Sequence, residues 1–338
     1  MTDEVILQVK DLRTYFYTDA GVVKAVDGLT FDLHKGETLG LVGESGSGKS
    51  VTNLSVIKLI QTPPGKIEGG EVLFNGEDLL KMSDARLREI RGDRIAMIFQ
   101  DPMSSLNPYL RISTQMIETI CLHQGLNKKA AKEKAIEMLK LTGIPAAEKR
   151  IDGYPHQFSG GMRQRVMIAM GLSCNPDILI ADEPTSALDV TIQAQILDLM
   201  QDLTHRLGTA VILITHSLGV VAGVCDTIVV MYAGRIVERG TTEDIFYDTK
   251  HPYTQGLIKS VPRLDRDDEG RLFSIEGQPP NVVDLPDCCP FYPRCHKALP
   301  VCKNRYPPVV QFSPTHCAAC WLYAQKDGGT FTAEDTTK

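Results

Sequence analysis

The residues from Gly43 to Ser50 read G-E-S-G-S-G-K-S and fit the phosphate-loop pattern G-x-x-x-x-G-K-[ST] at every fixed position. Glycines in such a loop let successive backbone N–H groups converge on phosphate oxygens at the start of a helix. Lys49 would add a cation for the β- and γ-phosphates, and the Ser50 hydroxyl would be a magnesium ligand. We therefore predict a nucleotide site formed by Gly43, Glu44, Ser45, Gly46, Ser47, Gly48, Lys49, Ser50 and Val51.

Two carboxylates stand at the end of a later apolar run, residues 178–181. Asp182 is the expected magnesium carboxylate, bound either directly or in the second shell of the ion. Glu183 is the natural general base, which would polarise water against the γ-phosphate. The alternative is that the pair only caps the helix that follows. The phosphate loop favours the first interpretation, in which the bound nucleotide is hydrolysed with magnesium.

A second glycine-rich segment, residues 158–164, reads F-S-G-G-M-R-Q and leads into an apolar helix at Val166. Ser159 followed by Gly160 and Gly161 at a helix start forms another anion-binding device. One nucleotide does not need two such loops from one chain. We infer that this loop caps the γ-phosphate of a nucleotide bound by another subunit.

Strands and helices must hold these segments in place, and the hydrophobic pattern predicts where they lie. The expected strands are 5–9, 29–33, 38–42, 70–76, 95–99, 178–181 and 210–215, and the expected helices are 51–57, 128–141 and 191–207. Strands that alternate with helices indicate a parallel sheet covered by helices. The mainly helical stretch 104–153 is predicted to be an insertion between two sheet regions.

Length and composition exclude some classes of protein. The 338 residues suffice for two domains, or for one large domain with insertions. The net charge of −6 gives no support for a nucleic-acid surface. No apolar run approaches the roughly 20 residues that span a bilayer, and the acidic start at residues 1–4 lacks the features of a signal peptide. We expect a cytoplasmic chain that reaches a membrane only through a partner.

In this order and spacing, the motifs resemble the ATP-binding subunit of an ABC transporter. The segment F-S-G-G-M resembles the family signature, in which L-S-G-G-Q is commonest; Gln164 is expected to supply part of the polarity missing at Met162. Gln100 resembles the Q-loop glutamine, which touches magnesium and responds to the membrane subunit. The resemblance assigns residues 186–189, ending at Asp189, to the D-loop, His216 to the switch histidine, and Phe16 to the adenine-stacking aromatic, with Tyr15 and Tyr17 as competitors.

The resemblance implies an α/β fold: a P-loop NTPase core of the RecA type, an antiparallel β subdomain, a helical ABC subdomain and a small Cys-rich C-terminal module. It places the nucleotide-binding core at residues 1–103 and 154–247 and the helical subdomain at 104–153, with the signature loop following at 158–164. Residues 248–323 would be the Cys-rich extension, and residues 324–338 a loose tail.

Six of the nine cysteines crowd between Cys288 and Cys320, and a reducing cytosol favours metal over disulfides for such a cluster. This region, with C-P-F-Y-P-R-C at 289–295, resembles the C-terminal extension of oligopeptide, dipeptide and nickel importer ATPases, where four cysteines hold an iron–sulfur cluster. The resemblance implies a [4Fe–4S] cluster, with zinc or unliganded thiols as alternatives. The implied ligands are Cys289, Cys295, Cys302 and Cys320, with Cys288 and Cys317 as competitors. The extension is expected to stand apart from the nucleotide machinery in a structural role.

The family implies an ATPase that powers uptake of di- or oligopeptides from the cytoplasmic face of the membrane. Its expected partners are a second, different ATPase subunit, two transmembrane permease subunits and an extracytoplasmic peptide-binding protein, with no nucleic acid. Two ATP molecules would be sandwiched between the two ATPase subunits. The alternatives are a soluble ABC ATPase of DNA repair or the ribosome, and an iron–sulfur regulatory protein that is gated by nucleotide. The sequence leaves open whether the substrate is dipeptide, oligopeptide or nickel.

Overall fold

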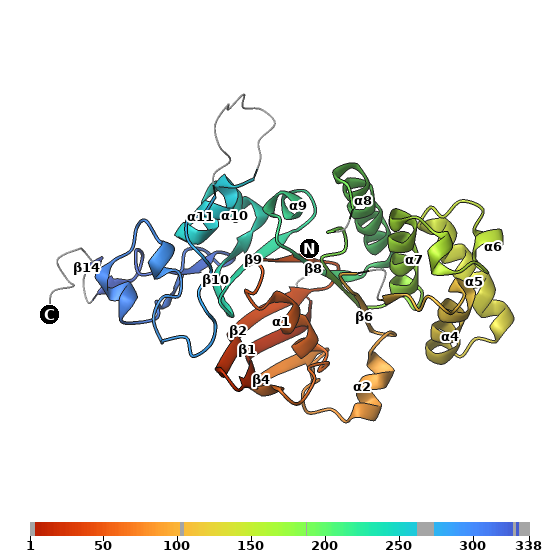
Figure 1. Cartoon of the computed structure of the whole chain (residues 1–338), viewed down its shortest axis with the longest axis horizontal. Coiled ribbons are helices and arrows are strands. Elements are labelled where there is room, and N and C mark those ends of the chain that lie inside the picture. Colours follow the sequence, from red (N-terminus) through yellow and green to blue (C-terminus); the bar gives the residue numbers. More distant parts are fainter. Residues whose placement is uncertain (1–3, 102–104, 187, 262–273, 327–328, 331–338) are drawn as a thin grey trace. The chain divides into compact units, whose positions relative to one another are not determined.

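The computed structural model describes residues 4–101, 105–186, 188–261, 274–326 and 329–330 (Figure 1). The chain divides by its internal contacts into two units, each assembled from separate stretches. We call them the carboxylate unit, Met1–Leu7, Leu33–Thr38 and Phe74–Ile214, and the phosphate-loop unit, Gln8–Asp32, Leu39–Leu73 and Thr215–Lys338. This division does not test the predicted domain boundaries, which stay a prediction.

In the described part of the phosphate-loop unit, most strands belong to two sheets. The first has the order β2-β1-β4, from Gly21–His34, Val5–Thr18 and Gly65–Phe74. The second has the order β11-β12-β10-β9-β3, from Val309–Gln311, Cys317–Ala319, Arg235–Thr241, Thr227–Tyr232 and Thr38–Val42. Its β3 and β9 run parallel, whereas β9-β10, β10-β12 and β12-β11 are antiparallel.

The helices of this unit are short. They are α1 Lys49–Val56, α9 Leu218–Ala222, α10 Thr242–Tyr247 and α11 Pro252–Lys259, with 3₁₀ turns at Tyr292–Arg294 and Pro300–Lys303. A small hairpin near the C-terminus pairs β13 Gln325–Lys326 with β14 Gly329–Thr330. The C-terminal stretch therefore contributes β11 and β12 to a sheet that also contains β3, the strand that leads into the phosphate loop.

The carboxylate unit holds three parallel strands in the order β8-β7-β6, from Ala210–Thr215, Ile178–Asp182 and Ile95–Ile98. All five residues of β7 are buried, as expected for the central strand of a parallel sheet. The other elements are β5 Glu77–Asp78, α2 Asp84–Ile90, α4 Ile112–Gln124, α5 Lys128–Leu141, α6 Ala147–Arg150, a 3₁₀ turn at Pro155–Gln157, α7 Gly160–Leu172 and α8 Val190–Leu207.

Most expected elements agree with the observed ones, because buried strands and amphipathic helices carry clear periods. The predicted helix 128–141 coincides with α5, and the predicted strand 210–215 with β8. The expected strands 5–9 and 29–33 are too short: β1 and β2 are 14 residues each and meet at the turn around Asp19 and Ala20. Of the helices in the described ranges, none is long and apolar enough to cross a membrane.

Candidate functional site

The phosphate loop connects β3 to α1, and its glycines are required by its own backbone. Gly48 stands at the N-terminus of α1 with φ of 102°. A Cβ atom at this position would lie 2.2 Å from the carbonyl oxygen of Ala25, and one at Gly43 would lie 2.3 Å from that of Met231. The neighbouring strands therefore approach the loop so closely that a side chain does not fit.

Lys49 and Ser50 carry the cationic and hydroxyl groups of the loop. Lys49 is 5% exposed, and its Nζ donates to the carbonyl oxygens of Gly43 at 2.7 Å and Glu44 at 2.9 Å. Ser50 is exposed in the first turn of α1. Lys49 thus binds two carbonyl oxygens of the loop. The start of α1 offers backbone N–H groups and a hydroxyl to a phosphate.

Phe16 lies on the face of β1 that meets α1, whereas Tyr15 and Tyr17 lie on the other face. Thr14 is two residues before Phe16 on the same face, and its Oγ1 is 2.7 Å from Oγ of Ser55 on α1. The hydroxyls of Tyr15 and Tyr17 donate to Asp27 and Glu68, at 2.7 and 2.6 Å. Of the three aromatics, Phe16 is the one that shares a face with the helix of the phosphate loop.

Asp182 ends the central strand of the carboxylate unit, and Glu183 follows it directly. Asp182 is 6% exposed as the last residue of β7. Glu183 has φ of 45°, an uncommon conformation for a residue other than glycine, of the kind that gathers at functional sites. Nε2 of Gln100, which follows β6, donates to Oε2 of Glu183 at 3.0 Å. The parallel strands thus bring two of the predicted catalytic residues into contact.

The second glycine-rich loop begins α7, with the helix starting at Gly160 rather than at Val166. Ser159 is the N-cap, and its Oγ accepts from the backbone N–H of Met162 at 3.3 Å. Gln164 is 1% exposed, and within the described ranges its Nε2 has no hydrogen-bond partner. The expectation that Gln164 makes up for the missing polarity of Met162 is therefore wrong, because this side chain points into the core.

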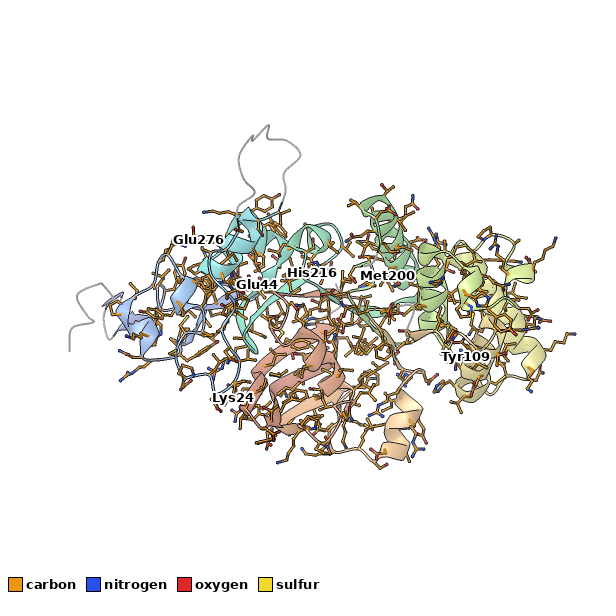
Figure 2. The ribbon with its side chains drawn as sticks, viewed as in Figure 1. Lys24, Glu44, Tyr109, Met200, His216 and Glu276 are labelled. Atoms are coloured by element: carbon orange, nitrogen blue, oxygen red, sulfur yellow. The ribbon has the colours of Figure 1, made fainter. Side chains whose placement is uncertain are left out.

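Two predicted residues remain. Asp189 caps α8, accepting from the backbone N–H of Ile192 at 3.0 Å; Ala187, in the same predicted loop, lies outside the described residues. His216 is exposed directly after β8 and belongs to the phosphate-loop unit, as does Glu44 (both labelled in Figure 2).

Sequence reasoning missed two residues that hold the phosphate loop. The backbone N–H of Glu44 donates to Oη of Tyr253 on α11, and the Glu44 carboxylate forms a two-pronged ion pair with Arg294. Arg294 lies in the segment C-P-F-Y-P-R-C, which the sequence marks only as a feature of the C-terminal extension, and Tyr253 lies in the segment H-P-Y-T at 251–254. The expectation that the C-terminal extension stands apart from the nucleotide machinery is wrong, because Arg294 belongs to it.

The four implied cluster ligands are near one another and largely buried. Burial raises the pKa of Cys289 to about 12, and neighbouring Cys302, Cys320 and Cys295 add to the shift. Burial likewise raises the pKa of Cys320 to about 11, with Cys295 and Cys302 contributing. Cys317 instead lies on β12 opposite Arg239. Within the described part of the chain, no group of three or more His, Cys, Asp or Glu side chains is arranged to hold a metal ion.

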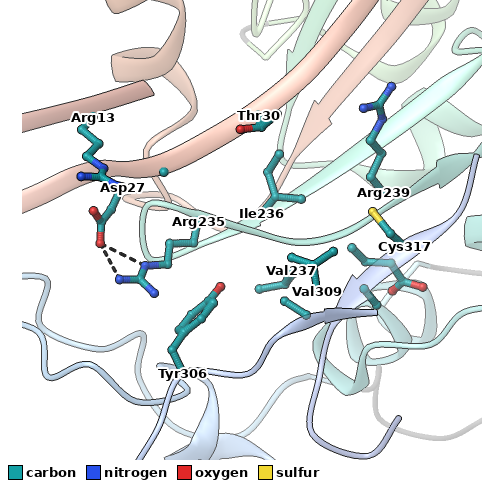
Figure 3. Close-up of a pocket in the computed structure, with 14 residues that line it drawn as sticks. Arg13, Asp27, Thr30, Arg235, Ile236, Val237, Arg239, Tyr306, Val309 and Cys317 are labelled. Atoms are coloured by element: carbon teal, nitrogen blue, oxygen red, sulfur yellow. Dashed lines mark hydrogen bonds and ion pairs between the residues drawn. The ribbon is translucent and has the colours of Figure 1, made fainter. Parts of the chain in front are cut away.

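A cavity of about 530 Å³ lies elsewhere in the phosphate-loop unit (Figure 3). Arg235, Tyr306 and Cys317 line it, and Arg235 pairs with Asp27 at 2.6 Å while its guanidinium lies 4.0 Å from the centroid of the Tyr306 ring. None of the predicted nucleotide residues lines this cavity, so its size does not mark the site of the chemistry.

Family models match two parts of the chain. Residues 26–186 match the model described as ABC transporter, and residues 237–302 match the oligopeptide/dipeptide transporter C-terminal region. The chain is 52% identical to the oligopeptide transport ATP-binding protein OppD of Bacillus subtilis, over 94% of this chain and 88% of the relative. It is 51% identical to the dipeptide transport ATP-binding protein DppD of the same organism, over 96% of each chain.

Solved structures resemble the cassette part. The ATP-binding cassette MJ0796, in a dimeric post-hydrolysis state bound to ADP and Pi, gives a TM-score of 0.63 at 27% identity. The match covers 98% of the MJ0796 chain and 70% of this chain. The structure of cbiO1 from Clostridium perfringens, part of the ABC transporter complex cbiONQ, gives a TM-score of 0.61 at 29% identity, covering 73% of this chain and 93% of that one.

Proposed function

Since the chain belongs to the family of oligopeptide and dipeptide transport ATP-binding proteins of ABC transporters, we propose that it powers uptake of di- or oligopeptides through partner membrane subunits. The observation that carries this is the phosphate loop, whose lysine and glycines have the geometry of a nucleotide site in a chain that matches both family models. The substrate class rests on the relatives' names. Di- and oligopeptides therefore remain equal candidates.

Each nucleotide residue receives a role from its chemistry. Lys49 and the backbone N–H groups of the phosphate loop hold the β- and γ-phosphates, and Phe16 stacks on adenine. Ser50 and Asp182 are the proposed magnesium ligands, with Gln100 as a further contact of the ion. Magnesium, when bound, neutralises charge that develops on the phosphate oxygens.

Glu183 is the proposed general base. Its contact with Nε2 of Gln100 orients the carboxylate, and loss or gain of that contact is a simple way for Gln100 to report the state of a partner. His216 steadies the γ-phosphate during the reaction. Because Glu183 would accept a proton from the attacking water, replacing it by Gln removes the base but keeps the shape of the side chain.

The signature loop has its proposed role in a second subunit's site. Ser159, Gly160 and Gly161 would cap the γ-phosphate held by the partner, with Asp189 beside that interface. Ser159, Gly160 and Asp189 are all exposed, as an interface loop requires. We propose a pair of different ATPase chains that sandwich two ATP molecules.

Exposed apolar side chains support docking to permease subunits at the cytoplasmic face of the membrane. In the carboxylate unit, Phe99 is 44% exposed, Tyr109 87% (labelled in Figure 2) and Leu122 75%. They lie near Gln100 and on the helical stretch 104–153, which we assign as the helical subdomain between core segments 1–103 and 154–247. Large apolar side chains in water mark contact surfaces when they gather in one region.

For the C-terminal stretch we propose a [4Fe–4S] cluster on Cys289, Cys295, Cys302 and Cys320, with zinc as the alternative. Support comes from four mutually neighbouring, largely buried thiols whose spacing lacks the close C-x₂-C pairs common in zinc sites. Because such thiols are neutral at pH 7, binding must release protons and draw the four sulfurs together. The proposal makes residues 248–323 a Cys-rich module. The expected loose tail 324–338 instead carries the β13-β14 hairpin in its described part, and residues 327–328 and 331–338 lie outside the described residues.

Anaerobic purification followed by iron, sulfide and zinc analysis tests the cluster. Four irons and four sulfides per chain are expected; zinc or no metal would contradict it. The Glu183→Gln variant tests the ATPase assignment: MgATP should bind as in the wild type, whereas turnover should fall by about 10²–10⁴-fold. Wild-type turnover in this variant would rule out Glu183 as the base.

A further inference from the structure

The acidic residue of the phosphate loop is fixed by an arginine from far along the chain. Arg294 donates from Nη1 to Oε2 of Glu44 at 2.6 Å and from Nη2 to Oε1 at 2.9 Å. The arginine side chain is 5% exposed and that of Glu44 25%. A planar guanidinium that meets both oxygens of a carboxylate fixes its direction as well as its distance.

Arg294 is itself held by three further acceptors. Its Nε donates to the carbonyl oxygen of Glu276 at 3.0 Å (Glu276 and Glu44 are labelled in Figure 2), and Nη2 donates to that of Ile275 at 3.3 Å. Nη1 also donates to Oη of Tyr232 at 3.2 Å, at the end of β9. The guanidinium therefore has little freedom to follow a moving carboxylate.

The segment that carries Arg294 packs on the same aromatic group that supports the loop backbone. Tyr253, which accepts the N–H of Glu44 at 2.8 Å, lies 4.6 Å from Tyr232 between ring centroids. The ring of Phe291 lies 5.3 Å from each of these tyrosines. Phe291 and Arg294 both lie between Cys289 and Cys295, so the conformation of this cysteine-bearing turn decides where both side chains point.

The charge of Glu44 explains why such a clamp is needed. Its carbonyl oxygen accepts from Nζ of Lys49 at 2.9 Å, so the carboxylate belongs to the residue that lies against the phosphate-binding lysine. An unpaired carboxylate there would repel a polyphosphate and attract the lysine. Pairing with Arg294 neutralises the carboxylate and holds it in the direction of the C-terminal segment.

We propose that Arg294 is a positioning residue for nucleotide binding, which acts by neutralising and fixing Glu44 and so makes the affinity for nucleotide depend on the turn between Cys289 and Cys295. The inference rests on the proposed function, because it requires that the phosphate loop bind MgATP. Occupation of the neighbouring cysteines by a cofactor would then act on the nucleotide site through Arg294.

Isothermal titration of the full chain with MgATP and with ADP tests this, using Arg294→Met, Arg294→Lys, Glu44→Gln and the double variant Arg294→Met/Glu44→Gln. Arg305→Met is the matched control, because Arg305 is an exposed arginine of the same segment. We expect Arg294→Met to raise the Kd for MgATP by about tenfold, because the free energy of a hydrogen bond between charged groups corresponds to a change of that size. The affinity of Arg294→Lys for MgATP should lie between those of the wild type and Arg294→Met. The double variant should bind MgATP more tightly than Arg294→Met, because no unpaired carboxylate remains.

The outcomes separate positioning from bulk stability. Equal affinity of Arg294→Met and Arg305→Met overturns the inference, as does a lower melting temperature of Arg294→Met with an unchanged Kd. If Arg294→Met does not fold, wild-type affinity for MgATP in Arg294→Lys overturns the inference instead, as does a loss of affinity in Glu44→Gln, which has no carboxylate left to neutralise. Lys49→Ala tests the premise separately: if the wild type binds no better than Lys49→Ala, the proposed nucleotide site fails before the role of Arg294 is in question.

Discussion

Two helices of this chain begin in glycine-rich loops, and the loops are built on different principles. At α1, Gly48 has φ of 102° and has no room for a Cβ atom. At α7, Ser159 caps the helix, and Cβ atoms at Gly160 and Gly161 would meet only side-chain atoms, at 3.8 and 3.1 Å. The first loop needs glycine for its own backbone. The second does not, which supports the view that its bare surface serves a molecule that approaches from outside.

The largest effect should come from Gly48→Ala. The added Cβ would lie 2.2 Å from a backbone oxygen in a conformation that costs about 1–3 kcal/mol for other residues. We expect loss of MgATP binding by titration and a lower free energy of unfolding in urea. Wild-type affinity for MgATP would show that the loop relaxes. The contrast between the glycine-rich loops at α1 and α7 would then fail.

Gly160→Ala should separate stability from activity. Its Cβ fits at ordinary contact distance, and alanine favours a helix over glycine by about 0.5–1 kcal/mol. The free energy of unfolding should therefore rise slightly, and binding of MgATP to the isolated chain should not change. Turnover in the assembled transporter should fall by about tenfold or more, as for loss of a transition-state contact. Unchanged turnover would remove the argument for an outside partner.

A substitution at Phe16 tests whether the first loop holds the chain's own nucleotide. Phe16→Ala should raise the Kd for ATP by about fivefold, since an aromatic stacking contact is worth about 1 kcal/mol or more. Tyr15→Phe is the matched control, because it removes the hydroxyl that donates to Asp27 on the opposite face. If the tyrosine variant has the larger effect on ATP affinity, the face assignment is wrong.

A pH dependence of stability is expected from the residues that support the first loop from a distance. Complete burial lowers the pKa of His251 to about 3, while its Nδ1 accepts the backbone N–H of Tyr253. Because the unfolded histidine titrates near 6.5, this stability is present above that pH and is lost as pH falls toward 3. Between pH 7.5 and 5.5 the wild type should lose about 1.4 kcal/mol more than His251→Asn.

Urea unfolding at both pH values measures this difference. His205→Gln, a change at an exposed histidine of the carboxylate unit, is the control and should behave as the wild type. Equal losses in wild type and His251→Asn would show that the ring is not kept neutral by burial.

The sequence predicts those features of the structure that a short, continuous segment of the chain marks by its own pattern. The phosphate loop, the strand ending in Asp182 and the helix 128–141 were predictable because fixed spacing or a regular period marks each of them. Gln100 and Glu183 were predicted separately; their contact arises because the parallel strands β6 and β7 end side by side. The pair of Glu44 and Arg294 was not predictable, because two charges 250 positions apart carry no common pattern. The length of β1 and β2 was missed because their outer halves are half exposed and lack strict alternation.

The pairing of β10 with β12 has a consequence for any shortened form of this protein. Glu238 and Arg239 on β10 pair with Ala318 and Cys317 on β12, and β11 follows as the next strand. Chain termination before Val309 would remove both strands and leave the backbone N–H and C=O groups of β10 unpaired along one side. Exposed strand edges of this kind recruit other chains and lead to aggregation. Strands β11 and β12 therefore protect this edge of the nucleotide-binding sheet, and we expect a chain cut before Val309 to aggregate.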